Sequence, residues 1–228
     1  MIALELSVPV ACWRKGRARE FLESEVLPPP ATCYGALLSL VGERDRERHR
    51  GCRVSAGLLN APATSVVLRT LWQIKDARTP QGVGENAGPD FQQLVLDARL
   101  VVWCDSSEEP DGGGERLEQR VVRALREPWT VERFGGWCLG ESTHLINDVR
   151  LLPDSRPPTE CRAFVHEPEG GVTLPVWVDH VGSRGSRYAV GSLKPLREAP
   201  RPEQLPRIPL ADSPEAGRPS GARRRRQA

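Results

Sequence analysis

The hydrophobic pattern of this 228-residue chain predicts an α+β fold built on an antiparallel sheet. Two observations support this fold class. Apolar residues alternate in several segments of strand length, and they recur with helical spacing in two others. The segments follow the order strand, helix, paired strands, helix, strand. This is the split-βαβ or ferredoxin-like plan also seen in RNA-recognition domains, in which both helices cover one sheet face and leave the other free.

The first strand and the first helix are predicted from the beginning of the chain. Residues 1–8 alternate between apolar and other side chains, as expected for a half-buried strand. In the stretch LPPPATCYGALLSLVG, the prolines keep the chain extended, Thr32 is the predicted N-cap and Gly42 the predicted end of a helix. Gly35 lacks a side chain where we expect a neighbouring strand, or a ligand at the helix N-terminus, to come close.

Further strands are predicted over residues 52–59, 66–74 and 91–104. In the second of these, one set of alternating residues is expected to face the core and the other to form a wet, cationic face. The expected inward residues are Val66, Leu68, Thr70, Trp72 and Ile74, and the expected outward ones are Arg69, Gln73 and Lys75. The polar segment 76–90 between the paired strands is too long for a tight turn, and such loops are functional or disordered.

The rest of the chain divides into three parts. A second amphipathic helix around residues 117–125 and a strand within 144–152 complete an N-terminal domain over residues 1–152. Residues 153–196 are predicted to form a small β-rich C-terminal extension. Residues 197–228 contain six prolines and end in RRRRQA, which predicts a disordered tail.

The charge of the chain is concentrated and not spread over its surface. The net charge is +2, but residues 197–228 hold eight arginines and four acidic residues, so residues 1–196 carry 24 cationic and 26 acidic side chains. A nucleic acid would therefore have to bind through local patches. Three clusters of cationic residues, at 14–19, 69–78 and 184–187, are candidates.

Several classes of protein are disfavoured. The six cysteines include no CxxC pair and no nearby ligand spacing, so we expect reduced thiols, no metal and no cofactor. No apolar stretch is long enough to span a bilayer, and no basic leader precedes the first strand, so a cytoplasmic protein that does not contact membranes is expected. No P-loop, HExxH or Ser-His-Asp spacing is present.

Three segments of the chain are similar to a known family. They are PPPATCYGALLSLVGE, LLNAPATSVVLRTLWQIKD and WCLGESTHLINDV, and together they place the resemblance over residues 1–152. The chain resembles the family of CRISPR-associated protein five, a repeat-associated RNA-binding subunit of type I surveillance complexes. The glycine-bearing segment before residue 197 fits the variable β-rich extension of that family.

The resemblance implies a role in assembly. Proteins of this family bind and cap the 5′ handle of the guide CRISPR RNA, contact the large subunit and the repeated backbone subunit, and reach target DNA only indirectly. The loop at 76–90 corresponds to the family's thumb, which implies that Lys75, Arg78 and Gln81 grip the handle. With the basic clusters and the first helix, the expected RNA-binding residues are Arg14, Lys15, Arg17, Tyr34, Arg69, Lys75, Arg78, Gln81, Arg184 and Arg187.

Two other functions remain as alternatives. One branch of the family is a metal-independent endoribonuclease whose site resembles a tyrosine with an adjacent lysine–histidine pair. Tyr34 matches the tyrosine, but no lysine of this chain neighbours a histidine, so no catalytic residue is assigned. Tyr34 also lies on the apolar helix face, where a buried role is the alternative to RNA contact. The third function is that of a scaffold subunit whose basic residues meet acidic proteins and no RNA.

Overall fold

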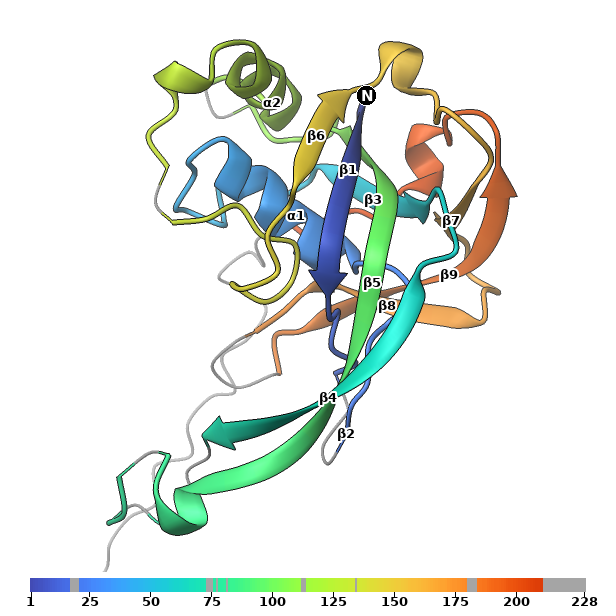
Figure 1. Cartoon of the computed structure of the whole chain (residues 1–228). Coiled ribbons are helices and arrows are strands. Elements are labelled where there is room, and N and C mark those ends of the chain that lie inside the picture. Colours follow the sequence, from blue (N-terminus) through green and yellow to red (C-terminus); the bar gives the residue numbers. More distant parts are fainter. Residues whose placement is uncertain are drawn as a thin grey trace, which may run out of the picture.

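The computed structural model describes residues 1–16, 21–72, 76, 78–80, 82–111, 114–133, 135–179 and 184–210. In this part of the chain, a large and mostly antiparallel sheet is accompanied by two helices, so the predicted α+β class is confirmed (Figure 1). The strands are β1 (Ile2–Ala11), β2 (Phe21–Leu22), β3 (Arg53–Leu58), β4 (Ala63–Trp72), β5 (Ala87–Asp105), β6 (Asp148–Leu151), β7 (Cys161–His166), β8 (Val172–Trp177) and β9 (Arg187–Leu196).

Hydrogen-bonded strands follow one another in the order β6-β1-β5-β3-β7-β9-β8, and β2 and β4 pair with β5 beside this path. Helix α1 (Pro30–Leu40) lies between β1 and β3 in the chain, and α2 (Leu117–Arg126) lies between β5 and β6. Apart from the short β2, this is the predicted succession of elements. Strand β7 pairs with β3, so the C-terminal strands extend the same sheet.

Helix α1 begins in a different way from the prediction. Pro29 occupies the N-cap position with an extended ψ of 152°, and Pro30 is the first helical residue. Proline suits that position because it has no N–H to satisfy. Thr32 lies inside the first turn, so its prediction as the N-cap was wrong. Gly42 ends the helix as expected, since its φ is +69° and its N–H donates to the carbonyl of Ser39.

The larger core lies between the two helices and one face of the sheet. The predicted apolar side of α1 is buried there, and so are Leu117, Val121 and Ala124 of α2. Gly35 lies on the opposite, exposed side of α1, and a Cβ placed on it would meet no heavy atom within 4 Å. The expectation that a neighbouring strand approaches Gly35 was therefore wrong.

The sheet face opposite the helices is not free, in contrast to the prediction. A second, smaller core forms on it, in which Trp103 of β5 is fully buried with Leu152 and Leu205. The Trp103 indole N–H donates to the carbonyl of Ser155 at 2.9 Å. The segments that follow β6 and β9 thus cover a surface that the order of strands and helices alone would leave open.

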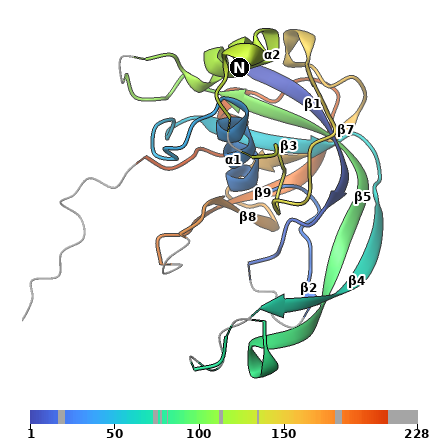
Figure 2. The same ribbon diagram turned by 60° about the vertical axis from the view of Figure 1, so that its left-hand side comes forward.

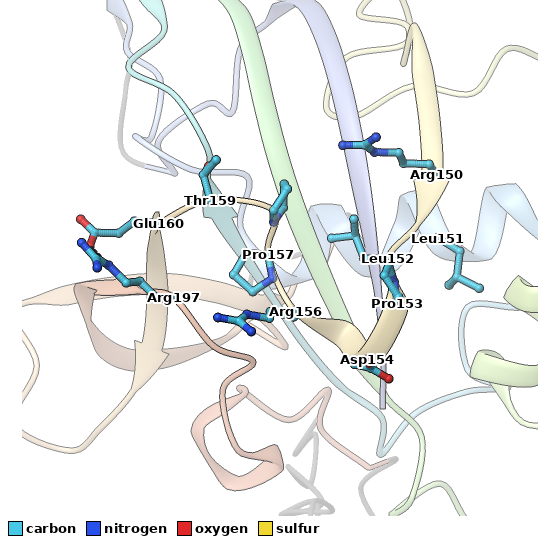
Figure 3. A pocket seen from close by; sticks show the side chains of 11 residues that line it. Arg150, Leu151, Leu152, Pro153, Asp154, Arg156, Pro157, Thr159, Glu160 and Arg197 are labelled. Atoms are coloured by element: carbon cyan, nitrogen blue, oxygen red, sulfur yellow. Dashed lines mark hydrogen bonds and ion pairs between the residues drawn. The ribbon is translucent and has the colours of Figure 1, made fainter.

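Beside this second core lies a groove with a volume of about 720 Å³, lined by residues 150–154, 156–160 and Arg197 (Figure 3). On the adjoining strands, Glu5 is buried and accepts hydrogen bonds from Arg99 and Arg150, each at 2.7 Å. Although burial acts to raise it, these two guanidinium groups hold the pKa of Glu5 below its usual value. The charges on this face are therefore largely satisfied within the protein.

Strands β4 and β5 leave the body of the protein together as a projecting ribbon (Figures 1 and 2). Val66 and Leu68 were expected to face the core, but 56% and 59% of their side chains are exposed. Thr70 is also exposed. The prediction was wrong because no layer covers this side of the ribbon in the described part of the chain. On β5, by contrast, Ala98, Leu100 and Val102 are buried.

Residues 197–210 include a 3-10 turn at Pro202–Gln204 and pack against the body of the protein, so the prediction of a disordered tail was wrong for these residues. Leu205 and Ile208 are fully buried. The Ile208 N–H donates to the Cys52 carbonyl at 2.8 Å, and its carbonyl accepts from the Gly51 N–H at 2.9 Å. Residues 211–228 lie outside the described part.

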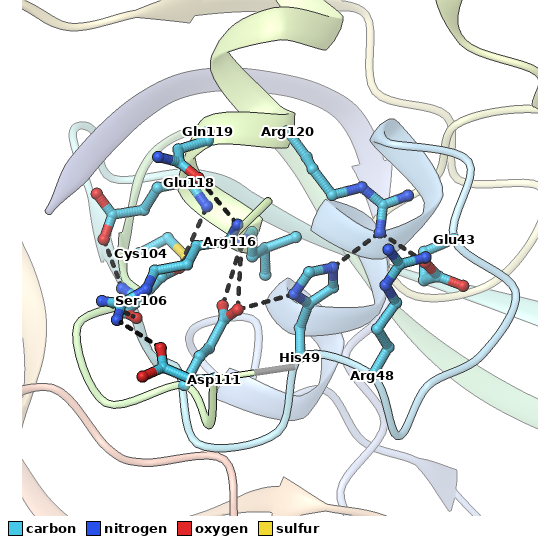
Figure 4. A network of polar contacts seen from close by, with 12 residues as sticks. Glu43, Arg48, His49, Cys104, Ser106, Asp111, Arg116, Glu118, Gln119 and Arg120 are labelled. Atoms are coloured by element: carbon cyan, nitrogen blue, oxygen red, sulfur yellow. Dashed lines mark hydrogen bonds and ion pairs between the residues drawn. The ribbon is translucent and has the colours of Figure 1, made fainter. Parts of the chain in front are cut away.

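A buried polar network joins the loop after α1 to α2 (Figure 4). Arg120 donates to Nε2 of His49 at 2.8 Å, and because a guanidinium can only donate, the proton of this imidazole lies on Nδ1 and is donated to Glu109 at 2.9 Å. Arg120 also donates to Glu43, as does Arg48. Burial acts to raise the pKa of Glu43, but the hydrogen bonds, above all that from Arg120, lower it to about 2.

This network predicts a pH-dependent contribution to stability. A carboxyl whose pKa is lowered on folding stabilises the protein at pH values above 4.5, which is its pKa in the unfolded chain. This stabilisation is lost as the pH falls toward about 2, the pKa of Glu43 in the folded protein. We expect Glu43→Gln to lower the free energy of unfolding by about 2–3 kcal/mol at pH 7 and to flatten its decline below pH 4.5. Urea unfolding at several pH values measures both effects.

The matched control is Glu115→Gln, because Glu115 forms an exposed ion pair with Arg123. We expect it to change the free energy of unfolding by less than about 1 kcal/mol. Equal stability of Glu43→Gln and the wild-type protein at pH 7 would show that the network does not hold the two elements together.

Candidate nucleic-acid interface

Arg69 lies where the projecting ribbon joins the body of the protein. Its guanidinium donates to Oε2 of Glu141 at 2.7 Å and also to the side chain of Gln92. Gln92 donates to the other oxygen of Glu141 at 2.6 Å. Arg69 is 38% exposed, so it presents a guanidinium that is oriented by one carboxylate and still reachable from solvent.

Two polar groups beside this junction connect it to the end of β1. The backbone N–H of Cys12 donates to Nδ1 of His144 at 3.2 Å, so this nitrogen is an acceptor. Burial lowers the pKa of His144; the charge of Glu141 acts against this shift, and the charge of Arg69 adds to it. Burial also raises the pKa of the Cys12 thiol, and Arg14 and Arg69 both act against that rise. Cys12 thus lies within electrostatic reach of Arg14 and Arg69, which belong to two of the cationic clusters.

Lys15 is already paired within the protein. Its ammonium contacts the carboxylate of Glu23 at 2.6 Å, and its backbone N–H donates to the carbonyl of the same residue at 2.8 Å. Residues 13–15 and 23–25 run side by side, because Arg14 and Ser24 form an antiparallel bridge. The local charge near Lys15 is therefore smaller than the sequence cluster suggests.

The third cationic cluster lies next to the first. A Cβ placed on Gly16 would lie 3.6 Å from the hydroxyl oxygen of Tyr188, whose side chain is 57% exposed. The turn before β9 is held by Asp179, which accepts a hydrogen bond from the N–H of Gly185 at 3.0 Å. Arg184 and Arg187 are exposed at this turn. Gly16 of the first cluster and Tyr188, which follows the third, thus lie side by side although they are far apart in the sequence.

Arg78 lies in the segment at the far end of the ribbon, where Trp72 of β4 is paired with Ala87 of β5. Its side chain is 94% exposed and lies 3.6 Å from Asp76. The buried amide of Asn86 organises this segment by donating to the carbonyl of Asp76 at 2.8 Å and accepting from its N–H at 2.9 Å. Arg17, Lys75 and Gln81 lie outside the described residues.

Tyr34 is placed differently from the other expected RNA-binding residues. It is only 3% exposed, packs 6.4 Å from the ring of Trp177 and donates from its hydroxyl to the carbonyl of Arg46 at 2.8 Å. Burial is the main cause that raises the pKa of its phenol. The buried alternative therefore describes Tyr34 in this structure, and its placement as an exposed RNA-contacting residue is corrected.

Sequence reasoning did not identify the acidic partners Glu23 and Glu141 or the amide of Gln92. Nothing in the local pattern marks them, because Arg69 and Glu141 are 72 residues apart in the chain. Among the described residues, no group of three His, Cys, Asp or Glu side chains is suited to hold a metal ion. No helix in that same part is long and apolar enough to cross a membrane.

These features define an α+β protein with a projecting two-stranded ribbon and several arginine side chains near its base. No model of a known protein family matches the chain. Its sequence is 72% identical over 212 residues to "CRISPR-associated protein Cas5" of Myxococcus xanthus (strain DK1622), covering 93% of this chain and 99% of that protein. The chain therefore belongs to the Cas5 family of CRISPR-associated proteins, and the resemblance seen in the sequence is confirmed.

Two solved structures are similar to this fold. One is a chain of a "CRISPR RNA-guided surveillance complex", with a TM-score of 0.59 and 14% identity, covering 87% of this chain and 90% of that chain. The other is a "Crystal structure of Cas protein", with a TM-score of 0.49 and 15% identity, covering 91% and 99% of the two chains. The first of these supports the fold.

Proposed function

We propose that this protein is a non-catalytic subunit of a type I CRISPR RNA-guided surveillance complex, in which it binds and caps the 5′ handle of the guide RNA. Its membership of the Cas5 family supports a place in a CRISPR complex. We further propose that the large subunit and the repeated backbone subunit of such a complex are its partners, that target DNA is reached only through them, and that it works in the cytoplasm.

The strand order supports a ferredoxin-like N-terminal domain. Strands β6, β1, β5 and β3 are adjacent in this order and antiparallel, which corresponds to the fourth, first, third and second strands of the split-βαβ plan. RNA-recognition domains of this plan use the free sheet face. Because that face is covered here by residues around Leu152 and Leu205, we propose that RNA binds at the base of the ribbon instead.

The observation that carries the proposal is the convergence of the cationic clusters at this base. The N–H of Cys12, two residues before Arg14, donates to His144, whose backbone N–H donates to the carbonyl of Glu141, the partner of Arg69. On the other side, Gly16 lies beside Tyr188. Guanidinium groups form forked contacts with phosphate. Stacking of a base on an exposed tyrosine contributes about 1–3 kcal/mol to the binding free energy. Cations gathered in this way give a local binding patch on a protein whose first 196 residues are not basic as a whole.

The ion pairs at this base set how RNA would bind. Arg69 and Lys15 already contact Glu141 and Glu23, so a phosphate group has to compete with two carboxylates. This competition lowers the affinity of the protein for a single phosphate group. It therefore favours a ligand that contacts several cations at once. A folded or kinked end of an RNA strand fulfils this requirement better than an extended strand that touches one cation at a time.

The absence of catalysis is part of the proposal. Tyr34, the residue matched to the nuclease tyrosine, is buried and its phenol has a raised pKa, which opposes a role as a base. His144 accepts a backbone hydrogen bond and has a lowered pKa, and His49 is held between Arg120 and Glu109. None of these groups is arranged to activate a 2′-hydroxyl, which favours a binder over a nuclease.

The test is the affinity of the purified chain for a repeat-derived handle RNA at several salt concentrations. We expect Arg14→Ala/Arg184→Ala/Arg187→Ala to weaken binding by about 10- to 100-fold and to reduce the salt slope by about 2, because up to three phosphate contacts are lost. In the same buffer with EDTA, the RNA should remain intact.

The control is Arg123→Ala/Arg126→Ala, which removes two cationic side chains from α2, away from the ribbon (Figure 1). It should bind RNA like the wild-type protein. Equal affinity of the triple variant and the wild type, with normal melting, would contradict the proposed site. No affinity for RNA in any variant would favour the scaffold alternative, and site-specific cleavage in EDTA would favour the nuclease.

A further inference from the structure

Four large apolar side chains form an exposed stripe on one face of the ribbon. Phe21, Phe91 and Leu68 lie directly opposite one another across β2, β5 and β4. Val66 is two residues from Leu68 on β4 and therefore points to the same face. The exposed fraction is 41% for Phe21, 54% for Phe91, 59% for Leu68 and 56% for Val66. We call these four residues the outer stripe.

The outer stripe continues into a hollow with a volume of about 300 Å³ near the base of the ribbon. Gln93, which is the partner of Val66 across the ladder, lines this hollow, and so does the next pair, Thr64 and Val95. Leu58 and Pro62 add apolar surface to it. Glu25 and Arg162 also line the hollow, so the uncharged apolar surface is the stripe itself, and exposed apolar surface of this kind marks a binding site.

The composition of this face decides which class of molecule fits it. On β4 the alternating positions that share the face are Thr64, Val66, Leu68 and Thr70, and on β5 they are Pro89, Phe91, Gln93 and Val95. None of them is charged. A nucleic acid gains much of its affinity from phosphate neutralisation, and these positions offer no cation for it. The apolar face therefore suits a polypeptide, whereas Arg69 lies on the opposite face.

The backbone of β4 offers a second means of recognition. In the described part of the chain, β4 pairs with β5 along ten residues, and no strand pairs with its other edge. Exposed edges are commonly protected by lysine, proline or a bulge, but this strand, ATSVVLRTLW, contains one charged residue and no proline. Its outer edge is therefore open for hydrogen bonding with another extended chain.

We propose that the outer stripe and the free edge of β4 bind an extended segment of another polypeptide chain by strand addition. The segment pairs with β4 and places apolar side chains at alternate positions over Phe91, Leu68 and Val66. This inference goes beyond RNA binding, because it assigns the two faces of the ribbon to different partners. The face that carries Arg69 turns toward the cationic base, and the outer stripe turns toward a protein.

A second copy of this chain fits the surface less well. Four partly exposed apolar side chains bury on the order of 400 Å² at most, whereas a stable dimer needs about 800 Å² per partner. A surface of this size suits a segment of a protein that is held by further contacts in an assembly.

The experiment places a photoreactive side chain on the outer stripe, by Phe91→p-benzoylphenylalanine, in a complex purified with its guide RNA and the proteins encoded beside this chain. Illumination should produce one crosslink, to another protein of the complex, and mass spectrometry should map it to an extended apolar segment. Leu68→Asp should reduce this crosslink at least tenfold and leave the melting temperature and the handle affinity of the isolated chain unchanged.

The matched control is Ser65→Asp, because Ser65 is exposed on the same strand but points to the other face. It should keep the crosslink. A crosslink to RNA, a crosslink to a second copy of this chain, the absence of any crosslink, or an undiminished crosslink in Leu68→Asp would each overturn the inference. Because handle affinity is measured separately on the isolated chain, failure of the RNA-binding proposal would be recognised independently.

Discussion

Removal of residues 200–228 is expected to lower the melting temperature by at least about 10 °C, although these residues follow the last strand of the sheet. Leu205 and Ile208 are fully buried, and backbone hydrogen bonds join Ile208 to Gly51 and Cys52. Each buried aliphatic side chain contributes about 1.5–3 kcal/mol and each hydrogen bond about 1 kcal/mol, so the loss is at least about 5 kcal/mol. Thermal melting followed by circular dichroism measures it.

The control for this truncation removes only residues 211–228. Because that chain keeps both buried residues, it should melt within about 2 °C of the full-length protein. If the chain that lacks residues 200–228 does not fold, Ile208→Ala tests the same packing. Its expected cost is about 2–4 kcal/mol of the free energy of unfolding, measured in urea. Wild-type stability of Ile208→Ala would contradict the role of this segment in the core.

The replacement Trp103→Ala is expected to cost about 3–5 kcal/mol of the free energy of unfolding. Trp103 is fully buried in the second core, and its indole N–H donates to Ser155 at 2.9 Å. The substitution leaves a cavity beneath the segment that covers this sheet face, and it leaves the Ser155 carbonyl without that donor. Urea unfolding of the variant tests this expectation.

Two further variants separate packing from hydrogen bonding at this site. Trp103→Phe keeps most of the apolar volume but lacks the N–H, so its cost should be smaller, about 1–3 kcal/mol. Trp129→Ala should change the free energy of unfolding by less than about 0.5 kcal/mol, because Trp129 is 79% exposed. Equal stability of Trp103→Ala and Trp129→Ala would mean that residues 152–155 do not cover the sheet in solution.

The helices and most strands could be predicted because their signals are local. The spacing of Leu117, Val121, Ala124 and Leu125 predicts an apolar helix face. The first three side chains are buried, and Leu125 is partly buried. The alternation through Val66 and Leu68 was read correctly as a strand but wrongly as a core face. An alternating pattern identifies the face that is apolar, but it does not show whether another layer covers that face.

The candidate site could be predicted only in part. The sequence identified cationic clusters, and in the structure hydrogen bonds through His144 and Glu141 link Cys12, two residues before Arg14, to Arg69, while Gly16 lies beside Tyr188. The pairing of Arg69 with Glu141 could not be predicted, because it depends on a contact between residues 72 positions apart. The burial of Tyr34 was one of two alternatives, and the packing of Trp177 against it decided between them.

The sequence by itself determined the α+β class, the succession of elements, the family and the places where cations are concentrated. All of these depend on residue type and short-range spacing. The tertiary structure decided which faces are covered. Leu205 and Ile208, which belong to a proline-rich segment, are buried, and the sheet face around Trp103 is covered. The outer stripe is exposed. The physical reason is that burial depends on contacts between distant segments, which the local pattern of neither segment contains.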